Sequence, residues 1–422
     1  MFYGWWIVVL TFFAGAFGGA TVWYGFTAFI SPLVNEFGWS YTAISFAASL
    51  RGVERGLLDV PFGFLVDRFG GRRIVFIGVI LVGIGFLILS RTNSLATFYL
   101  SFIIISCGAT SLGMVVFAPI INQWFNKKIG LTIGIVSAGF GAGGLAVPGI
   151  VYLLDMVGLR MVFVIIGIAA LVLGVFLAYF LRSRPGDIGL EPDGVPLKER
   201  VNSSERINQH PAKLVSPVRR YTLKETISSP PFWIITYLST VTIFTLQMVL
   251  THIMPYLEHI GYSRYTAGIV AMMVSVMSIA GRLGLGWISD FLNRKVMLIL
   301  VMVGQAAGMA LFFYARLSFF LIPFVLLFSV SYGGLLVLRL QALRDYYGTN
   351  SIGSIIGLSF GLSLIGSLFG PLLAGWLFDT TSSYNLAWVV SGILLLSGVP
   401  LILIMKNPSA PGEHSANEYS EG

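Results

Sequence analysis

The chain has 422 residues, of which 56% are hydrophobic and only 10% charged, and its formal net charge is +8. A mean hydropathy of +0.86 excludes a soluble globular domain and indicates a polytopic, all-α protein of the lipid bilayer. The single cysteine, Cys107, excludes an internal disulfide, and no Cys/His cluster suggests a metal site. We therefore expect neither a metal nor a cofactor.

Twelve apolar segments are each long enough to cross a bilayer. The first has no basic region before it and no small-residue cleavage site, which predicts a retained span rather than a signal peptide. The predicted spans are 4–33, 41–66, 74–90, 96–123, 129–154, 161–181, 230–257, 265–289, 296–315, 318–343, 352–378 and 385–405. A polar stretch divides them, which predicts a six-helix bundle over 1–182, a cytoplasmic linker over 183–229, a second six-helix bundle over 230–406 and a cytoplasmic tail over 407–422.

Basic residues are distributed unequally between the two sides of this topology. Of the 26 Lys and Arg residues, 19 fall in the turns after even-numbered spans, the linker and the tail, and four fall in the opposite turns. By the positive-inside rule, this predicts a multi-pass protein of the cell (inner) membrane with both termini in the cytoplasm. The positive charge is thus explained by topology and gives no indication of nucleic-acid binding.

The two halves of the chain repeat at one offset. The same residue types recur 223 positions apart at the pairs Pro32 and Pro255, Gly38 and Gly261, Ser40 and Ser263, Gly63 and Gly286, Asp67 and Asp290, and Pro148 and Pro371. One fixed offset across five spans indicates a duplicated six-helix unit. Parallel repeats with a substrate site at their interface are a known plan for transporters.

Acidic residues close spans 2 and 8 at equivalent positions. Asp67 and Arg68 lie in the segment 63–73, which ends in further arginines, and Asp290 lies in the weaker copy 286–295. An acid at a helix end beside cytoplasmic arginines can hold neighbouring helices in one state of a transport cycle, although an exposed pair contributes little to stability. Because two copies occur at one offset, we assign Asp67, Arg68 and Asp290 to gating.

Arg282 is a charged residue within predicted span 8. It lies eight residues before Asp290, where the apolar run ends, and so about 12 Å inside the membrane at 1.5 Å per residue. An arginine at this depth costs at least ~2.5–3.5 kcal/mol to insert and must face protein or water. Its guanidinium can either bind the carboxylate of an organic anion through two parallel hydrogen bonds or form a buried ion pair with a helix acid. The depth favours the anion site.

Span 2 carries four charges, Arg51, Glu54, Arg55 and Asp59. Spacings of three and four residues allow these side chains to pair within one helix, so a self-neutralised network is one interpretation. Asp59, however, lies 223 residues before Arg282, at the pseudo-symmetric position. This makes Asp59 and Glu54 the candidates for carrying a coupled proton.

Predicted depth supplies further candidates for the substrate site, although ordinary helix packing would explain each of them. Those near the level of Arg282 are Phe117, Tyr332, Ser359 and Ser363, and Tyr24 lies toward the outside together with Gln247 and His252.

These segments carry a resemblance to a known family. The segment 63–73 resembles the signature loop of the major facilitator superfamily, with Gly71 where that pattern usually has a basic residue. The segments 122–130, 184–189 and 231–233, together with Gly281 and Arg282, are similar to its oxalate/formate antiporter and monocarboxylate porter branch. The resemblance implies the twelve-helix major facilitator fold, and it implies that Arg282 binds the substrate carboxylate.

Two departures from that branch bear on the substrate. Oxalate-transporting relatives pair the arginine with a lysine in helix 11, and the aligned position here is Ser363. Mammalian monocarboxylate porters carry a lysine in span 1, and the segment 23–27 has none. One cavity cation suits one carboxylate, and the missing lysine puts the proton relay of the mammalian relatives in doubt.

The sequence thus predicts a monomeric secondary active transporter that moves a small monocarboxylate anion of the lactate or pyruvate type with a proton, by alternating access. The alternatives are an oxalate/formate-type dicarboxylate:monocarboxylate exchanger and a membrane sensor of carboxylates. No nucleophile–base or metal constellation appears in the spans, and no nucleotide-binding loop is present, so neither an enzyme nor an ATP-driven pump is expected.

Overall fold

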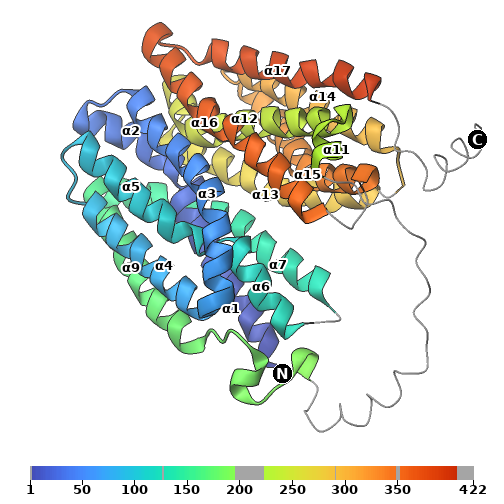
Figure 1. Cartoon of the computed structure of the whole chain (residues 1–422). Coiled ribbons are helices and arrows are strands. Elements are labelled where there is room, and N and C mark those ends of the chain that lie inside the picture. Colours follow the sequence, from blue (N-terminus) through green and yellow to red (C-terminus); the bar gives the residue numbers. More distant parts are fainter. Residues whose placement is uncertain (1, 126–127, 195–222, 290, 348–351, 406–422) are drawn as a thin grey trace, which may run out of the picture. The chain divides into compact units, whose positions relative to one another are not determined.

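The computed structural model describes residues 2–125, 128–194, 223–289, 291–347 and 352–405 (Figure 1). These residues form helices joined by turns, with no β-strand among them. Eleven segments of this described part are long and apolar enough to cross a membrane. The remaining predicted span, 41–66, corresponds to α3 (Tyr41–Phe69). This helix has 29 residues and is about 43 Å long at 1.5 Å per residue. The predicted all-α architecture with twelve membrane-spanning helices is therefore confirmed.

The spans of the first half are often composed of two helices in line. Apart from α3, their elements are α1 (Tyr3–Gly18), η1 (Gly19–Tyr24) and α2 (Phe26–Phe37), then α4 (Gly71–Leu89), α5 (Leu95–Thr110) and α6 (Met114–Trp124), α7 (Ile129–Ala142), η2 (Gly143–Ala146) and α8 (Val147–Val157), and α9 (Leu159–Phe180). Glycines explain the interruptions of the α-helix at η1 in span 1 and at η2 in span 5.

A Cβ on Gly19 would overlap the carbonyl oxygen of Phe140, and a Cβ on Gly143 would lie 2.6 Å from the carbonyl oxygen of Ala16. Spans 1 and 5 thus touch backbone to backbone where both are irregular.

The second half consists of longer, less interrupted helices. They are α12 (Pro230–His259), α13 (Arg264–Ile288), α14 (Arg294–Phe313), η5 (Ser318–Phe320) with α15 (Leu321–Tyr347), α16 (Ile352–Thr381) and α17 (Asn385–Ile404). Between the halves lie the short helices η3 (Pro185–Ile188), η4 (Pro192–Gly194) and α11 (Leu223–Ile227).

The repeat is visible at the end of the first span of each half. Gly38 follows α2 with φ of 68°, and Gly261 follows α12 with φ of 103°. Both are left-handed conformations that glycine adopts without the steric cost of a Cβ, so each ends its helix where the sequence repeats the same residue type.

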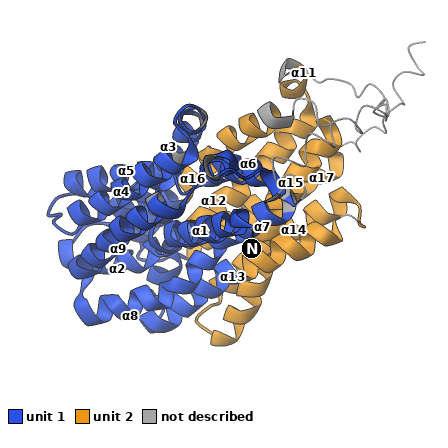
Figure 2. Cartoon of the chain, turned by 90° about the horizontal axis from the view of Figure 1, so that it is seen from below, with its two compact units in different colours: residues 1–211, 248–276, 371–384 blue, residues 212–247, 277–370, 385–422 orange. Residues whose placement is uncertain are grey.

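The chain forms two compact units (Figure 2). The first comprises residues 1–211, 248–276 and 371–384, and the second comprises 212–247, 277–370 and 385–422. The first unit therefore contains the six spans of the first half together with the ends of α12, α13 and α16 that the charge pattern predicts to face outside. The boundaries at 182, 229 and 406 remain a prediction.

Candidate functional site

Arg282 lies on α13 where this helix meets α15. A Cβ on the preceding residue, Gly281, would overlap the carbonyl oxygen of Val330, and a Cβ on Gly333 would overlap the carbonyl oxygen of Ser278. Two glycines on facing helices thus let the backbones of α13 and α15 touch. This contact fixes the position from which the Arg282 side chain extends.

Gly281→Ala is expected to lower the free energy of unfolding by roughly 1–3 kcal/mol, since the added methyl group must push α13 and α15 apart. Thermal unfolding of the purified protein in detergent measures the effect. Gly284→Ala is the matched control, because a Cβ at Gly284 has no atom within 4 Å. Equal melting temperatures for the two variants would contradict the close contact of α13 with α15.

The charge of Arg282 is partly withdrawn from water and has no acid beside it in the described part of the chain. Its side chain is half-buried, and its buried Nε has no hydrogen-bond partner among the described residues. The ion pairs between described residues do not include it. The alternative of a buried ion pair with a helix acid therefore finds no support there, and a guanidinium in this state can bind an anion.

Tyr332 lies on the turn of α15 that touches α13. It precedes Gly333, the residue whose backbone meets Ser278. Its ring is 1% exposed and packs at 5.6 Å, between ring centroids, from Phe328. The structure thus brings the helical turns of Arg282 and Tyr332 together, and the described contacts of Arg282 include none to Tyr332 itself.

Ser359 and Ser363 lie between α16 and α12 instead. The Ser359 hydroxyl is 2.9 Å from the hydroxyl of Thr236, and the Ser363 hydroxyl donates to the carbonyl oxygen of Ser359 at 2.8 Å. Both serines are buried. The described contacts therefore link them to α12 and not to Arg282. Thr236 was missed by the sequence reasoning, although Thr240, one turn further on, marks the same polar stripe of α12.

A second arginine of this unit lies within a helix and is buried. Arg339 falls in the predicted span 318–343, lies inside α15 and is 6% exposed. Its guanidinium carbon is 3.6 Å from the centroid of the Phe360 ring on α16. A cation held over an aromatic face is stabilised in this desolvated position, so Arg339 places a positive charge next to the α16 turn that carries Ser359.

In the first unit, the charges of α3 make contacts outside their own helix. Arg51 is 3% exposed, its guanidinium carbon is 4.5 Å from the centroid of the Trp23 ring, and its Nη1 donates to the carbonyl oxygen of Val22. Trp23 and Val22 belong to η1, a π-helical segment, and such segments are frequent at functional sites. These contacts connect Arg51 to span 1, whereas the sequence suggested pairing within α3.

Glu54 points to span 4. Its carboxyl group lies near the Ser106 hydroxyl, and its buried Oε2 has no hydrogen-bond partner among the described residues. Ser106 and Arg51 line a small pocket of about 10 Å³, whose other lining residues are Trp23, Ala109, Thr110, Gly113 and Phe140. Asp59 is half-buried further along α3, and the side chain of Arg55 lies outside the described residues.

Phe117 and Tyr24 also lie in the first unit. Phe117 is fully buried, and its ring lies 3.7 Å from the position of a Cβ on Gly15 of α1. Tyr24 is 8% exposed at the end of η1, next to Gly144. Both contacts are those of ordinary packing between spans, so the assignment of these two residues to a substrate site remains a prediction.

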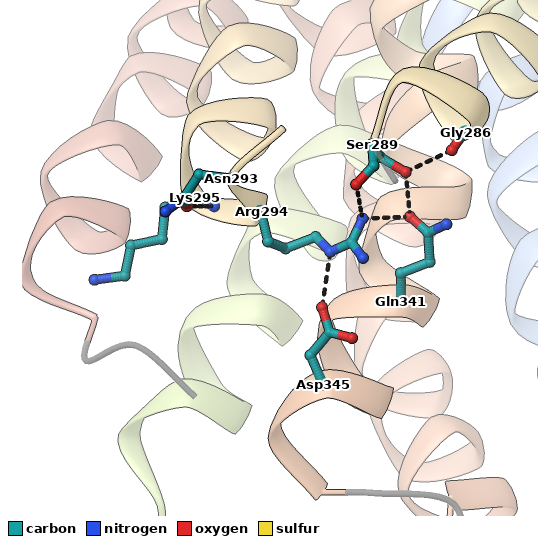
Figure 3. A network of polar contacts seen from close by, with 7 residues as sticks. All are labelled: Gly286, Ser289, Asn293, Arg294, Lys295, Gln341 and Asp345. Atoms are coloured by element: carbon teal, nitrogen blue, oxygen red, sulfur yellow. Dashed lines mark hydrogen bonds and ion pairs between the residues drawn. The ribbon is translucent and has the colours of Figure 1, made fainter. Parts of the chain in front are cut away.

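The predicted gating residues fall partly outside the described part of the chain, namely Asp290 and the side chain of Asp67. Arg68 is exposed, with its guanidinium carbon 5.4 Å from the centroid of the Phe69 ring. Within the second copy of the motif, 286–295, the described contacts are those of Arg294 (Figure 3), and the gating role of these residues remains a prediction.

Arg294 links the end of α13 to the end of α15 (Figure 3). Its Nε lies 2.8 Å from Oδ2 of Asp345, and its Nη1 donates to Oε1 of Gln341 at 2.7 Å and to the carbonyl oxygen of Ser289 at 3.2 Å. A planar guanidinium can make these three hydrogen bonds at once, which a lysine could not do with the same geometry.

Comparisons with known proteins agree on one family. A model described as "Major Facilitator Superfamily" matches residues 11–363 and 285–420. Monocarboxylate transporter 12 of Xenopus laevis is 26% identical over 99% of this chain and 94% of its own length. The oxalate:formate antiporter of Oxalobacter formigenes is 24% identical over 88% of this chain and 84% of its own length.

A solved structure shows the same fold. The crystal structure of a bacterial homologue of the human lysosomal transporter Spinster, inward-facing and unoccupied, is similar with a TM-score of 0.72 and 16% identity, over 95% of this chain and 96% of that one.

Proposed function

Because the chain belongs to the major facilitator superfamily, whose members are membrane transporters and not enzymes, we propose that it carries small monocarboxylates of the lactate or pyruvate type across the membrane. The observation that carries this proposal is Arg282. It is a guanidinium within a membrane span, with a buried Nε that has no hydrogen-bond partner in the described residues. Two relatives whose names include carboxylates, a monocarboxylate transporter and an oxalate:formate antiporter, support the choice of substrate class.

The chemistry of binding follows from the guanidinium. It is always charged, and it presents two parallel N–H groups that match the two oxygens of a carboxylate. In a desolvated site, such charge-assisted hydrogen bonds are about twice as strong as neutral ones. A monocarboxylate would neutralise Arg282 and leave its small apolar end to the surrounding helices, so loading would remove an uncompensated charge from the membrane interior.

We also propose that transport is coupled to a proton and that both termini face the cytoplasm of a cell (inner) membrane. A monocarboxylate that moves with one proton carries no net charge, so the membrane potential does not oppose it. Arg282 cannot supply the proton because a guanidinium does not deprotonate in proteins. The acids of α3, Glu54 and Asp59, are the groups that can.

Uptake by proteoliposomes tests the proposed function directly. The purified chain should accumulate radiolabelled lactate or pyruvate inside vesicles when the outside is made more acidic than the inside. Empty vesicles processed in parallel provide the control. If the protein binds lactate but shows no uptake under either a pH gradient or counterflow conditions, the transporter proposal is wrong and a sensor is favoured.

One observation favours a second candidate, an exchanger of the oxalate/formate type. Arg339 is a second cation of the same unit; it is buried and held on the ring of Phe360, next to Ser359. Two cations would suit two carboxylates, whereas a second carboxylate near Arg282 alone would be desolvated and unpaired.

Competition between substrates separates the two candidates. We expect lactate to displace a labelled monocarboxylate at lower concentration than oxalate does, because the second carboxylate of oxalate has no partner at Arg282. If oxalate is the better competitor, and if Arg339→Gln removes that advantage while lactate competition persists, the exchanger is correct and the monocarboxylate proposal is wrong.

A further inference from the structure

The N-terminus of α3 is capped by a residue from the other half of the chain. Tyr41 and Thr42, the first two residues of α3, donate their backbone N–H groups to Oδ1 and Oδ2 of Asp379 at 3.0 and 2.8 Å. The Thr42 hydroxyl donates to Oδ2 as well. Ser40, the local cap, accepts from the next N–H group, that of Ala43, at 3.1 Å. The free N–H groups at this helix start are thus shared between its own chain neighbour and the end of α16.

The contact is favourable in both electrostatics and packing. A carboxylate at a helix N-terminus interacts with the positive end of the helix dipole and accepts hydrogen bonds that the helix cannot satisfy internally. One turn before Asp379, the backbone of α16 approaches α3 closely. A Cβ on Gly375 would lie 2.8 Å from Oγ of Ser45 and 3.0 Å from the backbone nitrogen of Thr42. Glycine at this position is therefore required for the approach that brings Asp379 to α3.

A buried polar cluster lies below this cap. The Nε2 atom of His252 is 3.0 Å from both the Ser45 hydroxyl and the carbonyl oxygen of Pro371, and its Nδ1 is 3.1 Å from the Tyr384 hydroxyl. Since a carbonyl can only accept, Nε2 carries the proton and Nδ1 of the neutral ring accepts from Tyr384. One histidine thereby joins α12, α16 and the segment after α16 to Ser45 of α3.

All these residues belong to the first compact unit, and they lie at the ends of spans that the charge pattern predicts to face outside. A second interaction between the two sequence halves lies on the same predicted side. Arg264 at the start of α13 forms an ion pair with Asp155 of α8 at 3.0 Å. Alternating access requires that such ties between the two halves form and break in each cycle.

We propose that Asp379 is a latch of the outer gate: its carboxylate holds the start of α3 while this side of the transport path is closed, and it releases α3 when the side opens. Gly375 allows the closed contact, and the His252 cluster supports it from below. The carboxylate suits this role because it is exposed, so water can replace its hydrogen bonds when the helices part. The proposal requires that the chain is a transporter but not that its substrate is a monocarboxylate.

Chemical labelling of one cysteine tests the latch. The native Cys107 is replaced by alanine, and Ser45→Cys provides the reporter, because Ser45 is fully buried beneath the cap. The rate of modification by a maleimide is followed by mass spectrometry on purified protein in detergent. The reagent reaches both sides there, so the result depends neither on the orientation of the chain nor on any substrate.

Asp379→Ala is expected to raise the labelling rate about fivefold or more, as losing a helix cap shifts an equilibrium by roughly that factor. Thr42→Val removes one hydrogen bond and should give a smaller rise, whereas Gly375→Leu should act as a wedge and give a rise at least as large as that of Asp379→Ala. Thr380→Val is the matched control, because within the described part of the chain the Thr380 hydroxyl bonds to its own helix alone, at the carbonyl oxygens of Trp376 and Leu377.

Thermal unfolding establishes that each variant is folded before labelling. If Asp379→Ala and Gly375→Leu are folded and their reporters react at the parental rate, Asp379 is an ordinary surface cap and the latch is wrong. Should either variant fail to fold, the other one and Thr42→Val decide the question by the same comparison with Thr380→Val.

Discussion

Arg282→Ala is expected to abolish carboxylate binding and uptake while the protein stays folded. Removing one partner of a buried charged hydrogen-bonded pair costs about 2–5 kcal/mol of binding, a loss of roughly 30-fold to several thousand-fold in affinity. The fold should tolerate the change, since the buried Nε of Arg282 has no partner in the described residues that would be left unsatisfied. Alanine also removes the cost of holding a charge within the membrane.

Arg282→Lys is expected to fail as well, because an ammonium is a point charge and does not reproduce the two parallel hydrogen bonds. Binding is measured by the change in melting temperature with added lactate, and transport by uptake into proteoliposomes. Leu283→Ala provides the control, since the neighbouring side chain is 70% exposed on the surface of the same helix. Uptake at the wild-type level by either Arg282 variant would remove this residue from the substrate site.

The course of the helices follows from the sequence, because apolar length and turn residues determine it locally. Even α3, whose charges lower its hydropathy, is delimited by Ser40 as its cap and by Gly70 after its end. The breaks inside spans 1 and 5 are different. They arise where Gly19 and Gly143 bring two backbones together, and a contact between distant segments leaves no periodic signal in either of them.

The candidate site shows what depth alone cannot predict. Counting residues from a span end gives the level of a side chain but not the direction in which it points. Ser359 and Ser363 are candidates for the substrate site because their predicted depth in the membrane matches that of Arg282. In the structure, Ser359 contacts Thr236 of α12, and Ser363 donates to the backbone of its own helix, α16. Arg339 near the end of the predicted span 318–343 gave no sign of the aromatic ring that it meets, which is Phe360 of the next span. Asp379 gave no signal at all, since the helix that it caps begins 338 residues earlier.

Glu54→Gln is expected to abolish uptake driven by a pH gradient and to preserve exchange of substrate at equal pH. The structure now distinguishes the two acids that the sequence left together. Glu54 lies near the Ser106 hydroxyl, and its Oε2 is buried without a hydrogen-bond partner in the described residues. An oxygen in this state can take up a proton without breaking a contact, and the neighbouring Ser106 lines a small pocket together with Thr110.

Glutamine mimics the protonated, neutral side chain, so the variant should pass through the loaded half of the cycle and exchange labelled for unlabelled substrate. The variant cannot release a proton, so it should not convert a pH gradient into accumulation of substrate.

Asp59→Asn is measured alongside it and is expected to retain more gradient-driven uptake than Glu54→Gln does. Ser106→Ala, which removes only the hydroxyl near Glu54, should keep gradient-driven uptake but shift its dependence on pH. If Glu54→Gln and Asp59→Asn both accumulate substrate against a gradient like the wild type, the acids of α3 have a structural role, and the proton either travels elsewhere or is not coupled to transport.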